Sequence, residues 1–160
     1  MCTTTKLSHV DDHGKVSMVD ITSKAETNRT AIAEGFVFAE EQTLNQIRNN
    51  QLKKGDVLTT AHIAGIQGAK KTSDLIPLCH PLFLEKVSLE LTLKEDCIHV
   101  TCQASCKGKT GVEMEALTAV SVACLTIYDM CKAIDRSMMI SGIRLLEKAG
   151  GRSGHFILHE

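Results

Sequence analysis

The chain has 160 residues, of which 43% are hydrophobic and 23% charged, and its formal net charge is −1. This composition is typical of a soluble globular protein, and the length suits a single domain with its own core. A near-neutral charge, the absence of tryptophan and a total of one tyrosine and four phenylalanines argue against a nucleic-acid partner, which needs clustered cations and stacking rings. We therefore expect one domain over residues 1–160.

The sequence indicates neither a membrane span nor an export signal. No apolar run approaches the roughly 18 residues that a spanning helix requires, and the first residues are polar. We therefore expect a cytoplasmic protein without a membrane partner.

The cysteines are odd in number and lack the C-x-x-C spacing of many metal sites; they are Cys2, Cys79, Cys97, Cys102, Cys106, Cys124 and Cys131. In a cytosolic chain they are mostly small buried hydrophobic residues. Cys102 and Cys106 lie four apart in a predicted strand, so they are about 13 Å apart and cannot hold one ion by themselves. We expect no metal site.

The first third of the chain is predicted to contain an irregular arm, a strand and a short helix. Residues 1–30 are polar, with a possible short strand at 18–21. A strand is predicted over 31–38, where Gly35 indicates a bulge or a close contact. A short helix follows over 40–50, with Leu44 and Ile47 facing inward.

The next helix is predicted to begin at Val57, with Asp56 as its N-cap, and to end before Pro77. Ala61, Gly65 and Gly68 give it a face without large side chains. Glycine costs up to about 1 kcal/mol in a helix relative to alanine, so we expect another backbone to approach closely there.

The rest of the chain alternates as strands around one long helix. Residues 82–93 and 98–104 alternate apolar and polar side chains, which predicts two half-buried strands joined by a turn. A long apolar helix and a strand over 138–146 follow, and residues 148–160 form a flexible glycine-rich tail. This order predicts an α+β protein with a ferredoxin-like antiparallel sheet and helices packed on one face.

The start of the long helix carries two carboxylates, Glu113 and Glu115. Thr110 and Glu113 fit the S/T-x-x-E capping box, which gives Glu113 a structural role as an alternative to a catalytic one. Near the helix end, Asp129 and Lys132 interrupt an apolar pattern. Charges on a buried helix are costly unless paired or used, so these two residues are candidates for function. The alternative is an i, i+3 surface ion pair.

Two further segments carry residue types that occur in binding or catalytic sites. Gly108-Lys109-Thr110 resembles the end of a P-loop, but that motif needs a glycine where this chain has Gln103. Phosphate binding, if present, is expected from basic residues beside glycines, namely Lys53, Lys54, Lys132, Lys148 and Arg152. Cys79 and His80 lie in an extended stretch between two prolines, where neighbours point to opposite sides and cannot form a catalytic dyad.

Three motifs resemble those of the cyclic pyranopterin monophosphate synthase family, the second enzymes of molybdenum cofactor biosynthesis: residues 74–81 (DLIPLCHP), 108–118 (GKTGVEMEALT) and 128–133 (YDMCKA). Shorter matches occur at 18–20, 54–56 and 63–67, and the resemblance extends from about residue 9 to 156. One departure is in the tail, where the family usually reads Gly-Gly-Lys-Ser-Gly-Asp-Phe and this chain has Arg152 for the lysine and His155 for the acid.

The resemblance implies a cofactor-free rearrangement of a cyclised GTP derivative into cyclic pyranopterin monophosphate and pyrophosphate. Carried onto matching positions, it implies that Asp129 is a general acid/base and that Lys54 and Lys132 are catalytic or phosphate-neutralising partners. The substrate contacts that it implies are Leu78, Cys79, His80, Glu113, Met114 and Glu115. It also implies a hexamer built as a trimer of dimers.

The spacing of these residues has a consequence for assembly. Glu115 and Asp129 lie 14 residues apart on one predicted helix, which separates their backbones by roughly 21 Å. If both serve one compact site, they come from different subunits. Two other functions remain open from the residues alone, a ligand-sensing module of ferredoxin-like fold and a zinc-dependent hydrolase.

Overall fold

The computed structural model describes residues 15–151 and 154–159, and within them the chain builds one antiparallel sheet. Its order is β2-β3-β1-β4-β5, and every neighbouring pair is antiparallel. The strands are β1 (Thr27–Phe38), β2 (Lys86–Leu93), β3 (Cys97–Gly108), β4 (Met139–Ala149) and β5 (His155–Ile157). The two long central strands, β1 and β3, pair along their whole length.

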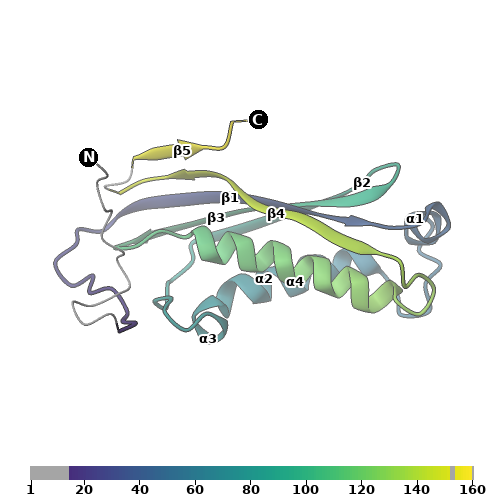
Figure 1. Cartoon of the computed structure of the whole chain (residues 1–160), viewed down its shortest axis with the longest axis horizontal. Coiled ribbons are helices and arrows are strands. Elements are labelled where there is room, and N and C mark those ends of the chain that lie inside the picture. The colour runs from purple at the N-terminus through teal and green to yellow at the C-terminus, as the bar shows by residue number, and fades with distance from the viewer. Residues whose placement is uncertain (1–14, 152–153, 160) are drawn as a thin grey trace.

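The two long helices, α2 (Val57–Lys70) and α4 (Glu113–Cys131), cover one face of this sheet (Figure 1). The shorter helices are α1 (Glu41–Arg48) and α3 (Thr72–Leu75). In chain order, β1, α2, β2, β3, α4 and β4 form the split βαββαβ unit, with β5 as an added edge strand. The predicted α+β fold with helices on one face is confirmed.

The core lies between the sheet and the two long helices. Alternate residues of β1, including Ala31, Ala33 and Val37, are fully buried on the helix side. The cysteines at 97, 102, 106, 124 and 131 are buried free thiols. Burial raises the pKa of Cys102 and of Cys124 to about 12, so these thiols act as small hydrophobic side chains, as predicted. Cys2 lies outside the described residues.

The small residues on α2 allow it to pack directly against α4, as the sequence predicts. A Cβ atom placed on Gly65 would lie 3.0 Å from the Ala119 carbonyl oxygen of α4 and 2.4 Å from a methyl of Leu89. A Cβ atom placed on Gly35 of β1 would likewise lie 2.7 Å from a methyl of Val120, and the register of β1 against β4 shifts beside Gly35. Both features predicted for Gly35 are present.

We expect Gly65→Ala to destabilise the protein by about 1–3 kcal/mol, because the new methyl overpacks the α2–α4 contact. The sign of the change in the free energy of unfolding is informative, because replacing glycine by alanine normally stabilises a helix by about 1 kcal/mol. Urea unfolding measures the free energy directly. Lys70→Ala, at an exposed position of the same helix, is the control and should change it by less than about 0.5 kcal/mol. A stabilised Gly65→Ala protein would contradict the close approach.

Several boundaries differ from those that the sequence predicts. Residues 18–21 form no strand, and β1 begins at Thr27, within the predicted arm. The helix from Val57 ends at Lys70 rather than shortly before Pro77, and the short α3 follows it. Regular structure also extends into the predicted tail, since β4 continues to Ala149 and β5 follows.

By length and composition alone, the helix α4 could cross a membrane, although it is not an unbroken apolar run. More than half of its apolar window is buried inside the protein. It packs against α2 and against strands β1, β3 and β4. This is the position of a core helix in a two-layer fold.

Candidate active site

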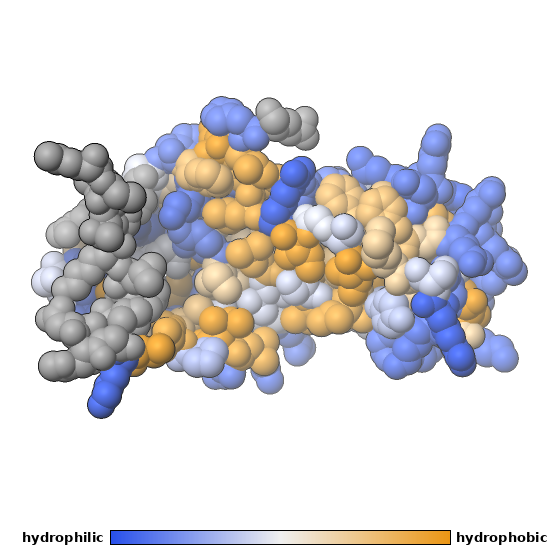
Figure 2. Space-filling model, in the orientation of Figure 1, coloured by the Kyte–Doolittle hydropathy of each residue, from blue (hydrophilic) through white to orange (hydrophobic). Residues whose placement is uncertain are grey.

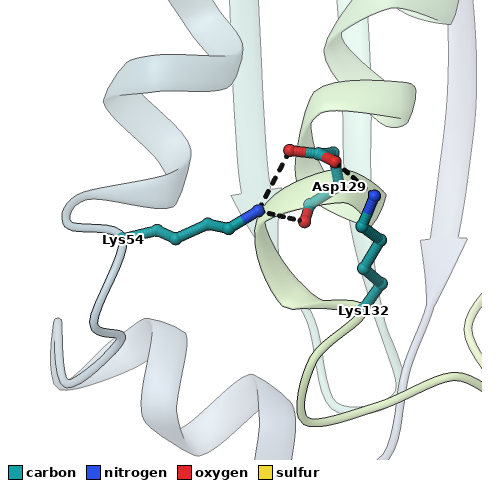
Figure 3. A network of polar contacts seen from close by, with 3 residues as sticks. All are labelled: Lys54, Asp129 and Lys132. Carbon is teal, nitrogen blue, oxygen red and sulfur yellow. Dashed lines mark hydrogen bonds and ion pairs between the residues drawn. The ribbon is translucent and has the colours of Figure 1, made fainter.

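A cluster of one carboxylate and two lysines lies at the C-terminal end of α4 (Figure 3). Lys132 Nζ lies 2.7 Å from Asp129 Oδ1, and Lys54 Nζ lies 3.1 Å from Asp129 Oδ2. Lys54 also donates a hydrogen bond to the main-chain carbonyl of Asp129, at 2.8 Å. The three residues that the sequence proposes as catalytic are therefore in direct contact.

The local structure explains how a residue 75 positions away joins this pair. Lys54 precedes Gly55, whose positive φ of 91° turns the chain into the cap of α2. Asp56 then caps that helix by accepting a hydrogen bond from the Thr59 amide, as predicted. Lys132 follows the last residue of α4, where the negative end of the helix dipole favours a cation.

The cluster is exposed, whereas the apolar pattern of the helix predicts that Asp129 and Lys132 are charges on a buried helix. The side chains of Asp129, Lys132 and Lys54 are 58%, 54% and 46% exposed. Although α4 is a core helix, its polar arc reaches solvent at this end, so these charges are not desolvated within one subunit. The Asp129–Lys132 contact is indeed an i, i+3 surface pair, but Lys54 from another element makes it a network.

Ion pairing sets the charge of this cluster. The Lys132 ammonium, followed by that of Lys54, holds the pKa of Asp129 below its ordinary value. The same contact with Asp129 raises the pKa of Lys132. At neutral pH Asp129 is therefore an ionised carboxylate, which can accept a proton but is a weaker base than an isolated aspartate. The two lysines beside it suit the binding of an anion.

We expect Lys132→Ala to raise the pKa of Asp129 toward its ordinary value, and Lys54→Ala to raise it less, because Lys132 is the stronger of the two influences. Titration of the Asp129 side-chain carboxyl by carbon-13 NMR measures both shifts. Lys53→Ala, a change at the exposed neighbouring lysine, is the control and should leave the titration nearly unchanged. An unchanged midpoint in Lys132→Ala would contradict the network.

The second group of predicted site residues lies at the opposite end of α4, around a cavity of about 250 Å³. All six proposed substrate contacts line this cavity: Leu78, Cys79, His80, Glu113, Met114 and Glu115. The remaining wall includes Lys24 and part of the segment that leads into β1. The structure therefore gathers these six side chains from α4 and from the loop that follows α3.

The capping box predicted at this helix start is absent, which changes the role of Glu113. The N-cap residue is Val112, and no side chain caps the helix. Instead, Lys148 Nζ of β4 lies 2.8 Å from Glu113 Oε1. Glu113 is thus a paired charge at the cavity wall, whereas Glu115 is only 4% exposed.

A larger cavity of about 710 Å³ adjoins the first, since Thr110, Gly111 and Glu113 line both. Its basic side chains are Lys24, Arg29, Lys109 and Lys148, and Gly150 and Gly151 form part of its wall. Of these side chains, only Lys148 is among the predicted phosphate ligands. Arg29 donates hydrogen bonds to the carbonyls of Gly108 and Gly150, at 3.4 and 3.2 Å. Arg152 lies outside the described residues.

Sequence reasoning missed Arg29, Lys24 and Lys109 as a group. Arg29 and Lys24 fall in the segment predicted to be an irregular arm, and Lys109 belongs to a motif rejected as a P-loop. The signal that could have indicated a phosphate site is the glycine beside Lys109, Gly108. In the structure Arg29 lies near Gly108, because β1 and β3 pair in this region.

Comparison with known proteins bears on both groups of residues. The sequence pattern of the MoaC family matches residues 18–151. The chain belongs to the MoaC family. A relative from Heliobacterium modesticaldum, named cyclic pyranopterin monophosphate synthase, is 54% identical over 156 residues, which cover 96% of this chain and 98% of that protein. The resemblance stated from the sequence motifs is confirmed.

The MoaC-family match over residues 18–151 includes both ends of α4. It therefore includes the Asp129 cluster and the two adjoining cavities, which one uninterrupted helix separates. Fourteen residues at about 1.5 Å each separate the backbones of Glu115 and Asp129 by roughly 21 Å. In this chain, the two groups therefore lie at opposite ends of α4.

Proposed function

We propose that this MoaC-family chain converts the 3′,8-cyclised dihydro derivative of GTP into cyclic pyranopterin monophosphate, with release of pyrophosphate, in molybdenum cofactor biosynthesis. One observation carries the proposal, the 54% identity to a protein named for that synthase over 96% of this chain.

The chemistry agrees with the side chains at hand. The reaction reorganises a purine-derived ring into a pterin and closes a cyclic phosphate, so its steps are proton transfers and a phosphoryl displacement. Asp129 acts as an acid/base group, and Lys54 and Lys132 stabilise negative charge on the phosphates. The six proposed substrate contacts that line the smaller cavity bind the substrate.

The larger cavity suits the triphosphate end of the substrate. Lys24, Arg29, Lys109 and Lys148 bring positive charge to a wall that glycine backbone also lines. Arginine and lysine bind phosphate oxygens strongly, and glycines let the ligand approach the main chain. Glu113 already neutralises Lys148 in part, which helps a highly charged product such as pyrophosphate to leave.

We further propose that two subunits share each site. A twofold axis near the middle of α4 would bring the Asp129 end of one helix beside the Glu115 end of its partner. Figure 2 shows apolar side chains gathered over the middle of the face that α4 and β4 present. The exposed apolar residues of these two elements include Leu125, Met139 and Ile143. A hexamer of three such dimers, located in the cytoplasm, is the assembly that we propose.

The test is turnover of the cyclised nucleotide by the purified protein. We expect pyrophosphate and the cyclic pterin phosphate to appear in equal amounts. Binding of the nucleotide without pyrophosphate release would overturn the proposal and favour a ligand-sensing module.

A further inference from the structure

Glu115 is a carboxylic acid in a place that disfavours its charge. It lies in the first turn of α4 and is 4% exposed, yet it lines the smaller cavity. Burial raises the pKa of Glu115 to about 7, and the negative charge of Glu113 raises it further, while a hydrogen bond from its own backbone amide lowers it. A carboxyl group in this setting keeps its proton where other carboxyl groups have lost theirs.

The groups around Glu115 come from every element packed against it. Cys79 and His80 line the same cavity from the loop after α3, and Lys24 lines it from the segment before β1. Burial raises the pKa of the Cys79 thiol and of the Cys106 thiol on β3, and the negative charge of Glu115 raises both further. These thiols are neutral at physiological pH and offer no charge to stabilise a carboxylate.

Lys148 of β4, which lines the adjoining larger cavity, is already paired. Lys148 contacts Glu113 at 2.8 Å, and the Glu113 side chain is 25% exposed. Two carboxyl groups two residues apart on α4 therefore have different surroundings, because Glu113 pairs with Lys148 whereas Glu115 is buried. The surroundings of Glu115 raise its pKa, whereas the lysines beside Asp129 lower the pKa of that residue. Acids whose pKa values are separated in this way commonly divide the acid and base roles between them.

We propose that Glu115 enters the reaction in its protonated form and is the proton donor to the ring system of the substrate, while Asp129 remains the ionised acceptor. This inference rests on the proposed function and adds to it the protonation state and role of a residue otherwise assigned only to binding. The ring of a purine-derived substrate fits this assignment because its nitrogen lone pairs accept protons.

The step balances simply. The O–H bond of Glu115 breaks, and a lone pair on a ring nitrogen forms the new N–H bond. Glu115 is left as a carboxylate, and the ring gains one positive charge, which prepares an adjacent C–N bond for later cleavage. Solvent water reaching the cavity returns the proton to Glu115 after product release.

Infrared difference spectroscopy tests the protonation state without any turnover. The carbonyl stretch of a protonated carboxyl group should be present in the wild-type protein at about pH 6 and largely lost at about pH 8, with a midpoint near 7. Glu115→Gln, which is nearly isosteric with the protonated acid, should remove this band, whereas Glu113→Gln should keep it. A spectrum without the band at pH 6 would overturn the inference.

Kinetics test the role. Glu115→Gln can still donate a hydrogen bond but cannot release a proton, so we expect kcat to fall by about 100-fold or more while KM changes little. The wild-type rate should also decline as pH rises through about 7, and this limb should vanish in the variant. Equal kcat in the two proteins would overturn the donor role.

The two proposals fail differently. A wild-type protein that shows the infrared band but never releases pyrophosphate would refute the proposed function. An active wild-type protein without the band would refute only the role of Glu115.

Discussion

Asp129→Asn is expected to fold normally and to lose nearly all turnover of the cyclised nucleotide, by about 100- to 10,000-fold. Asparagine has almost the same shape, and its one side-chain oxygen can still accept a hydrogen bond from one of the two lysines, while Lys54 keeps its hydrogen bond to the main-chain carbonyl. Its amide, however, cannot take up a proton at neutral pH. The effect should appear in kcat rather than KM, because Lys54 and Lys132 remain to bind phosphate. Steady-state rates of pyrophosphate release, with circular dichroism to verify folding, measure it.

A matched control is the same change at an exposed aspartate away from both groups. Asp96 lies in the turn between β2 and β3, so Asp96→Asn should keep wild-type rates. Turnover within a few-fold of wild type in Asp129→Asn would remove Asp129 from the chemistry and leave it as a surface ion pair.

Mixing inactive Asp129→Asn protein with inactive Glu115→Gln protein is expected to restore activity. In a shared site, a mixed dimer has one site that carries both changes and one that carries neither. Random exchange of equal amounts makes about half of all dimers mixed, so about one quarter of wild-type activity should return. The rate is measured after incubation under conditions that exchange subunits, with differently tagged chains to demonstrate the exchange.

The outcome distinguishes two geometries. No recovery despite demonstrated exchange would mean that one subunit supplies both residues along an extended substrate. The test requires that both variants are inactive, because a Glu115→Gln protein that kept most of its activity would leave no lost activity to restore. Each variant is therefore first assayed alone.

Much of the fold could be predicted because local chemistry and tertiary packing agree. The Asp56 cap, the alternation of β2 and β3 and the small face of α2 each admit few alternatives, and together they give the βαββαβ order. The sequence also predicted Asp129 and Lys132 as a pair, since charged residues stand out on an apolar helix.

The remaining features depend on contacts between distant segments. Glu113 fits a capping box locally, but a lysine on β4 provides a stronger partner than the helix start does. The burial of Glu115 requires β3 and the loop after α3 to close over it, which no helical pattern reveals. The role of Arg29 could not be predicted because its segment is polar. Polar residues can still form the beginning of a long strand once the neighbouring strands are in position.

Because α4 is one uninterrupted helix, its length fixes the distance between the two groups of site residues in the enzyme that we propose. One residue inserted near its middle would shift one end by about 1.5 Å and rotate it by about 100° relative to the other. In a shared site, that single change would misalign both copies at once, because each helix contributes to two sites. Side chains along the helix are therefore free to vary within the limits of packing, while its length is not, and natural variation in chain length should fall in the loops and termini of this protein rather than between residues 113 and 131.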